Sequence, residues 1–214
     1  MDNLFSADSA LMRGLTVVAD VMILNLVFIV TSLPVVTLGA SLTALNFTAM
    51  RIAKGQCNSV TGDYFRSFRQ NFRQATLVGL VLALLGLVLA AWYSVITNLM
   101  SGAAEFALLA IWYILVFILA TTALFAFPYL ASFEGRTREV LRNALLLSGK
   151  HLLTSLLALA LIALSLGVTI FFPHVTGYGI GWLAIGFAGI ATINGILFAR
   201  VFRTYLATSR SNPA

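Results

Sequence analysis

The stretch HLLTSLLALALIALSLGVTIFFPHVTGYGIGWLAIGFAGIATINGILFA, residues 151–199, holds 49 consecutive residues without an Asp, Glu, Lys or Arg side chain. A helix that crosses the hydrocarbon core of a bilayer needs about 20 mostly apolar residues. The run is therefore long enough for two spans, and the proline and glycine within 173–177 predict a short turn between them. It predicts two membrane-spanning helices, near 151–172 and 178–199.

Three further spans are predicted upstream by the same criterion. Runs of 31 and 28 residues without a charged side chain follow Arg73 and Glu105, and each accommodates one span, near 75–97 and 107–131. The apolar segment near 14–33 predicts a first span that ends just before a proline. The sequence therefore predicts an all-α protein, a polytopic transmembrane helical bundle.

Residues 36–53 decide whether this bundle has five spans or six. The segment VTLGASLTALNFTAMRIA is short and rich in Thr and Ser, so it is either a thin sixth span or a helix in the interface. Basic residues collect on the cytoplasmic side of membrane proteins. Five spans place 12 of the 13 Lys and Arg residues there, whereas six place all 13 there with both termini cytoplasmic, which favours six. Residues 1–207 then form one transmembrane domain, and residues 208–214 are expected to be a disordered cytoplasmic tail.

The overall composition supports a membrane protein. Apolar residues make up 60% of the 214 and charged residues 9%, with a mean hydropathy of +0.99, whereas soluble domains are about 25% charged. A soluble domain, a disordered chain and a disulfide-stapled scaffold are excluded. The net charge of +6 lies in short clusters between apolar runs, so the expected partner is the lipid bilayer rather than a nucleic acid. Cys57, the only cysteine, is expected to be a plain thiol.

Two basic amphipathic segments are predicted to form short elbow helices on the cytoplasmic side. In DYFRSFRQNFRQA, residues 63–75, helical spacing places a stripe of phenylalanines beside a stripe of arginines. Such a helix lies in the headgroup layer, with its rings at the acyl boundary; alternatively, the same face docks a partner membrane protein. The second segment, residues 133–151, contributes two of its three arginines to the candidates. The candidate surface residues are Phe65, Arg66, Phe68, Arg69, Phe72, Arg73, Arg138 and Arg142.

Four polar side chains within the predicted spans are candidates for a role inside the membrane: Asp20, Asn25, Asn46 and Asn194. A charge inside a span is costly, so Asp20 is either paired across helices or part of a transport path. The asparagines are expected to bond between helices and to fix their register. Asn25 and Asn46 face one another if the first two spans form a hairpin.

Small residues four positions apart predict that another helix approaches the end of the chain closely. The two pairs are Gly177 with Gly181 and Ala191 with Gly195. The neighbour is either another span of the same chain or a second copy in a homo-oligomer.

The sequence carries no recognised pattern for catalysis, a metal or a cofactor. Its two histidines, His151 and His174, are 23 residues apart, and it has no HExxH, CxxC, P-loop or GxSxG motif. Hydrolysis and phosphoryl transfer need titratable groups that converge, and the seven acidic residues are scattered. We expect a protein that is not an enzyme and that holds no cofactor or metal.

The first eighty residues resemble a known family. The motifs are VADVMILNLVFIVTSLPVVTLGASLTALN, residues 18–46, the NLF near the start and the YFRSFRQNFRQA segment. They are similar to the YesL family of bacterial integral membrane proteins, whose function is unknown, so the resemblance implies a bacterial cell membrane and no catalytic residues to carry over. Members of this family often accompany ATP-driven, binding-protein-dependent carbohydrate uptake systems and glycoside hydrolases.

The resemblance therefore implies a non-enzymatic accessory or regulatory component of a carbohydrate uptake system, with an ABC-type permease as its partner. The residues by themselves leave an alternative open, which is a small autonomous transporter that uses the intramembrane polar side chains.

Overall fold

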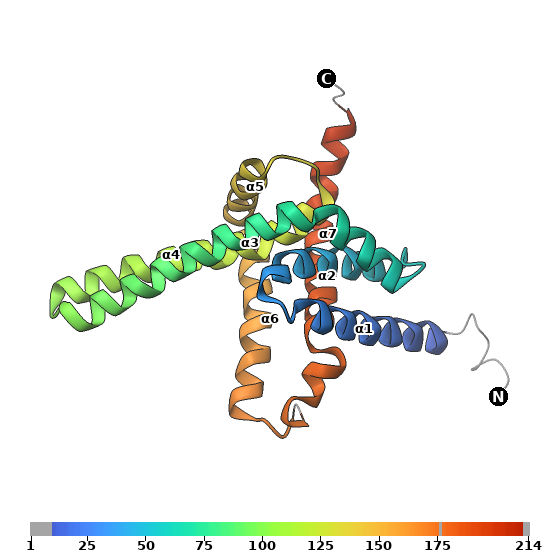
Figure 1. Cartoon of the computed structure of the whole chain (residues 1–214), viewed down its shortest axis with the longest axis horizontal. Coiled ribbons are helices and arrows are strands. Elements are labelled where there is room, and N and C mark those ends of the chain that lie inside the picture. The colour runs from blue at the N-terminus through green and yellow to red at the C-terminus, as the bar shows by residue number, and fades with distance from the viewer. Residues whose placement is uncertain (1–9, 176, 212–214) are drawn as a thin grey trace.

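The computed structural model describes residues 10–175 and 177–211. In this part of the chain seven α-helices follow one another and no strand occurs: α1 (Ala10–Ser32), α2 (Leu38–Ala53), α3 (Val60–Leu99), α4 (Ala103–Ser132), α5 (Thr137–Lys150), α6 (Leu152–Phe171) and α7 (Phe187–Ser211). A 3-10 turn, Val35–Thr37, precedes α2, and a π-helical turn, Trp182–Gly186, leads directly into α7. The all-α prediction is confirmed (Figure 1).

Six of these helices are long and apolar enough to cross a bilayer. They are α1, α2 with its preceding turn, α3, α4, α6, and α7 with the π-helical turn. Each predicted span corresponds to one of them. Residues 36–53, whose crossing was the open question, belong to the candidate span formed by the 3-10 turn and α2. Helix α5 matches the second predicted amphipathic segment, and the Glu139 carboxylate caps its start by accepting a 2.9 Å hydrogen bond from the Arg136 amide.

Helix α3 departs from the prediction of a separate first elbow. It runs unbroken for 40 residues, so the basic segment 63–75 belongs to the same helix as the third apolar span. The Ser59 side chain caps its start by accepting a 3.2 Å hydrogen bond from the Gly62 amide. No proline lies between residues 60 and 99, so nothing in the backbone forces a break where the polar pattern becomes apolar.

Helix α2 is the most enclosed of the candidate spans. Of its most apolar 18 residues 56% are buried, whereas the corresponding share is 11–28% in the other five candidate spans. Helix α2 is enclosed because it packs against α1, α3, α4 and α7. Its approach to α3 is close: a Cβ atom added to Gly39 would overlap the carbonyl group of Ala75, and Gly79 faces Gly39 across the crossing. Glycine at position 39 therefore lets the two backbones meet.

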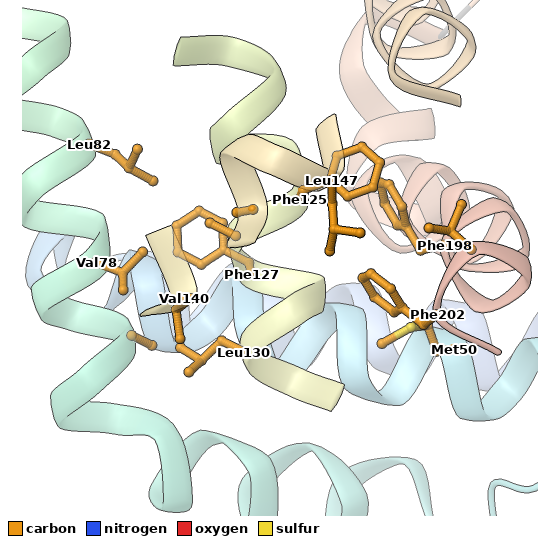
Figure 2. Close-up of a cluster of buried hydrophobic side chains, with 14 of the residues drawn as sticks. Met50, Val78, Leu82, Phe125, Phe127, Leu130, Val140, Leu147, Phe198 and Phe202 are labelled. Carbon is orange, nitrogen blue, oxygen red and sulfur yellow. The ribbon is translucent and has the colours of Figure 1, made fainter. Parts of the chain in front are cut away.

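The larger apolar core lies where α4, α5 and α7 gather around α2 and α3. Figure 2 shows Phe198 and Phe202 of α7 on one side of α4 and Phe127 on the other side, toward Val78. The rings of Phe125 and Phe198 meet edge to face with their centroids 4.9 Å apart. Helix α5 turns the buried side chains of Val140 and Leu147 toward this core. The core therefore holds α5 against the candidate spans.

Away from this core the helices separate into arms that point in different directions. The α3–α4 hairpin extends to one side, whereas α6 and the start of α7 run steeply away from it (Figure 1). The α3–α4 arm is held together by Trp112, whose indole nitrogen donates a 2.8 Å hydrogen bond to the Leu89 carbonyl. Apolar surface alone does not make helices pack in a bilayer, because lipid tails cover it equally well.

Helix α7 continues to Ser211, four residues into the segment 208–214 that was predicted to be a disordered tail. No proline or glycine occurs between Gly195 and Pro213 to end the helix earlier. Residues 212–214, like the NLF motif near the start, lie outside the described residues.

Gly39→Ala is expected to destabilise the protein by about 1–3 kcal/mol. The added methyl group overlaps backbone atoms of α3, which cannot move aside as a side chain does by changing its rotamer. Gly86→Ala is the matched control, since Gly86 has open space around it. There the same change should stabilise the helix by up to about 1 kcal/mol. Thermal unfolding of both variants in one detergent measures the difference, and equal unfolding temperatures would contradict the close crossing.

Candidate functional site

Two arginines converge on one buried carboxylate where α2 ends and α3 begins. Asp63 accepts a hydrogen bond from Arg51 Nε at Oδ2, 2.7 Å, and one from Arg66 Nη2 at Oδ1, 2.5 Å. The ring of Phe47 lies 5.8 Å from the first guanidinium group and 6.0 Å from the second. The Asp63 side chain is 9% exposed, and a buried charge requires such partners. Arg66, predicted to face lipid phosphate, is thus paired inside the protein while half of it stays exposed.

A chain of hydroxyl groups joins α1, α2 and α3 in the interior. The Tyr64 hydroxyl lies 2.5 Å from Thr31 Oγ1, which also accepts a 3.2 Å hydrogen bond from Ser41 Oγ. Tyr64 and Ser41 are fully buried, so these bonds satisfy groups that have no access to water. The sequence prediction missed Tyr64 and Asp63. The available signal was an acidic residue in the first turn of a helix with an arginine three residues later.

Asn25 on α1 holds the π-helical turn that precedes α7. Its amide nitrogen donates to the carbonyl oxygens of Trp182 and Leu183, at 2.8 and 2.7 Å, and its amide oxygen accepts a 3.0 Å bond from the Ala188 amide. A π-helical turn interrupts the regular helical hydrogen bonds, and backbone groups in an apolar interior need partners. The fully buried Asn25 supplies them. The interhelical bonds expected of Asn25 are present, but they go to the last span and not to Asn46.

Asn46 and Asn194 line one cavity. It measures about 470 Å³ and lies between α1, α2, α4, α6 and α7. Asn46 donates a 2.8 Å hydrogen bond to the Leu42 carbonyl of its own helix. The Asn194 side chain is buried, and its amide oxygen has no hydrogen-bond partner among the described residues. The interhelical bonds expected of these two asparagines are therefore not found in the described part of the chain.

Asp20 is half-buried beside the turn between α2 and α3. It lines a hollow of about 340 Å³ together with Cys57 and Ser59. Among the described residues the ion pairs are made by Asp63, and none involves Asp20, so the predicted pairing is not observed. Burial raises the pKa of the Cys57 thiol to about 11, and the Asp63 carboxylate adds to the shift. The thiol is therefore protonated near neutral pH and a weak nucleophile.

No metal site is formed within residues 10–175 and 177–211, where no three His, Cys, Asp or Glu side chains gather.

The predicted surface residues divide into an exposed group and a packed group. Phe68 and Phe72 pack against the apolar core, so their rings stabilise the interior and do not form a membrane-facing stripe. The exposed members on α3 and α5 are Phe65, Arg66, Arg69, Arg73, Arg138 and Arg142, and of these Arg66 pairs with Asp63. The other four arginines make no ion pair with a described residue. Their positive charge on α3 and α5 is therefore available to anionic headgroups or to a partner.

One of the two predicted small-residue pairs marks a helix contact. A Cβ atom added to Gly195 would lie 3.3 Å from Met50 Cγ of α2, and Ala191, one turn earlier, is buried. Gly177 instead begins a 3-10 turn with a φ of 59°, and Gly181 directly precedes the π-helical turn. The two glycines of this first pair therefore do not share one continuous helix face.

These features describe an all-helical protein with six candidate membrane spans, as in a multi-pass membrane protein, whose interior polar groups join α1, α2, α3 and the start of α7. Residues 21–93 match the model of a family described as a protein of unknown function, DUF624. No curated protein and no solved structure matches the chain. The matched segment overlaps the YesL-like motifs, and it contains the Asp63 ion cluster, the hydroxyl chain and Asn25.

Asn25→Leu is expected to destabilise the protein by about 2–3 kcal/mol, because a side chain of similar size leaves two carbonyl groups and one amide without a partner. Asn46→Leu is the matched control, since it removes a bond within one helix and should cost less than about 1 kcal/mol. Unfolding of both variants in mixed micelles compares them. Equal losses would show that the bonds from α1 to the π-helical turn contribute no stability.

Proposed function

We propose that this protein is a non-enzymatic accessory component of a carbohydrate uptake system in a bacterial cell membrane. The YesL-like motifs and the family match over residues 21–93 support a membrane protein of this family, whose members often accompany ATP-driven uptake systems. Its partner is the membrane-spanning permease. Its role is to hold or regulate that permease through contacts between helices.

The observation that carries this proposal is the uncovered α3–α4 arm. On α3 the side chains of Leu80, Leu84 and Leu87 are 61–68% exposed, and on α4 Phe106 and Tyr113 are 77% and 62% exposed. Large contiguous apolar surfaces mark contacts with membrane or protein partners. A hairpin that extends beyond the other helices (Figure 1) offers such surface to a second membrane protein on more than one side.

Two interior polar groups are not available to a transported substrate, whereas Asn194 Oδ1 has no partner among the described residues. Asn25 is fully engaged with the backbone of the last span, and Asp63 is neutralised by two arginines. A transport path needs polar groups that are available to the substrate. These two groups already have protein partners.

Recovery of the permease with a C-terminally tagged protein tests the proposal. The tagged chain is extracted gently from sugar-grown cells, and the proteins that co-purify in fixed stoichiometry are identified. Replacing Leu84 and Leu87 together by alanine should lower recovery of the permease about tenfold, which corresponds to a loss of about 1.4 kcal/mol of packing energy. Replacing Leu156 and Leu157 of α6, which are 50% and 52% exposed, is the matched control and should leave recovery unchanged.

Two outcomes contradict this proposal. A tagged protein that purifies alone and stable, while sugar-dependent growth requires Asp20, supports the autonomous transporter. Recovery that falls equally with the α6 control places the contact outside the α3–α4 arm.

The six-span topology, with both termini cytoplasmic, makes a separate prediction about the turn between α1 and α2. Val35 there is 78% exposed, and in a Cys57→Ser background Val35→Cys should react with an impermeant thiol reagent added to intact cells. Ser101→Cys, in the turn between α3 and α4, is the positive control, and Gly135→Cys, between α4 and α5, is the negative control. Labelling of Ser101→Cys without labelling of Val35→Cys would establish the five-span alternative.

A further inference from the structure

The cavity lined by Asn46 and Asn194 has the properties of a binding site for a small apolar molecule. Its volume of about 470 Å³ lies within the usual range of ligand sites, roughly 300–1,000 Å³. Aromatic and aliphatic side chains form most of its wall, and none of the described residues that line it is acidic or basic. An ion or an unmodified sugar needs many more polar partners than this wall offers.

One polar group in the wall lacks a partner. The Asn194 side chain is 3% exposed, and its Oδ1 atom accepts no hydrogen bond among the described residues. A buried acceptor without a donor is unfavourable, and native structures rarely keep one. The wall therefore contains two amide side chains in an otherwise apolar lining: Asn194, whose oxygen lacks a partner, and Asn46, whose nitrogen bonds to its own helix.

The approach to the cavity lies on the apolar side of the protein. Leu166 of α6 and Phe187 of α7 belong to its wall, yet they are 48% and 41% exposed. Both residues lie on helices that qualify as membrane spans or directly continue one. A ligand that enters between α6 and α7 therefore comes from the hydrocarbon region and not from water.

We propose that this cavity binds a long-chain alcohol or an equivalent single-chain amphiphile, whose hydroxyl group donates a hydrogen bond to Asn194 Oδ1. The chain fills the apolar volume between α2, α4, α6 and α7, and the hydroxyl satisfies the buried amide oxygen. This site is independent of the partner contact made by the α3–α4 arm. It would hold whether or not the protein assembles with a permease.

Trp182 provides a direct measurement because it lines the cavity. Its indole nitrogen donates a 2.7 Å hydrogen bond to Thr169 Oγ1 on α6, so the ring is held at the wall. With Trp92 and Trp112 changed to phenylalanine, Trp182 is the only tryptophan of the full chain. The probes are 11-bromo-1-undecanol and its methyl ether, 11-bromo-1-methoxyundecane, titrated as mole fractions in detergent micelles. Bromine quenches indole fluorescence on contact, and only the alcohol can donate a hydrogen bond.

The expected result is saturable quenching by both probes, with about fivefold tighter binding of the alcohol, as one net hydrogen bond provides. Asn194→Leu should remove this preference and leave the ether unchanged. Ala123→Phe should abolish saturable quenching because it fills the cavity, whereas Ala110→Phe, on the exposed arm, should not. Ala120→Leu is a milder filler should Ala123→Phe fail to fold, as judged by circular dichroism.

Two results would overturn the proposal. Equal affinity for the alcohol and the ether in the unmodified site would show that Asn194 Oδ1 accepts no hydrogen bond from the ligand. The cavity would then bind apolar chains without recognising a hydroxyl group. Quenching that rises linearly with probe, and does so equally in the filled variants, would show that no site exists.

Discussion

The backbone contact between α2 and α3 at Gly39 is the constraint on which the other contacts depend. Because position 39 has no Cβ atom, the two helices cross closely enough for Tyr64 and Asp63 of α3 to reach partners on α1 and α2. On its other side α2 meets α7, where Gly195 admits Met50. Helices immersed in lipid gain little by burying one more leucine, so small residues that permit close approach select which helices become neighbours.

Polar side chains then fix the arrangement that close packing permits. The partners of Asn25 are backbone groups 157 to 163 residues further along the chain, so one side chain connects the first span to the start of the last. The Asp63 cluster does the same for the end of α2 and the start of α3. In a medium of low dielectric constant such bonds are directional and costly to leave unmade, and they therefore define one geometry among several that apolar packing would accept.

The spans were predictable from the sequence because bilayer thickness imposes a local requirement of about 20 apolar residues. The continuity of α3 was not, since the change from basic to apolar residues near Ala75 alters the surface of the helix without breaking its backbone. The helical spacing of residues 63–75 predicted a phenylalanine stripe beside an arginine stripe. It did not indicate that Asp63 faces α2, because that orientation depends on the crossing of α2 and α3 at Gly39. The partner of Asn25 is a backbone irregularity that carries no sequence signature.

The positions of the cavity and of the uncovered arm have one physical cause. Beyond the crossings at Gly39 and Gly195, the helices carry apolar side chains that lipid covers as well as protein does. The α3–α4 hairpin and the α6–α7 pair consequently diverge (Figure 1), which leaves the arm without protein cover and an apolar space around Asn194 where the directions part. Asn25 and Asp63 already bond within the chain, whereas Asn194 Oδ1, like Thr48 Oγ1 and Thr76 Oγ1, has no partner among the described residues. The surfaces available to a ligand or a partner are therefore those that the protein's own helices leave uncovered.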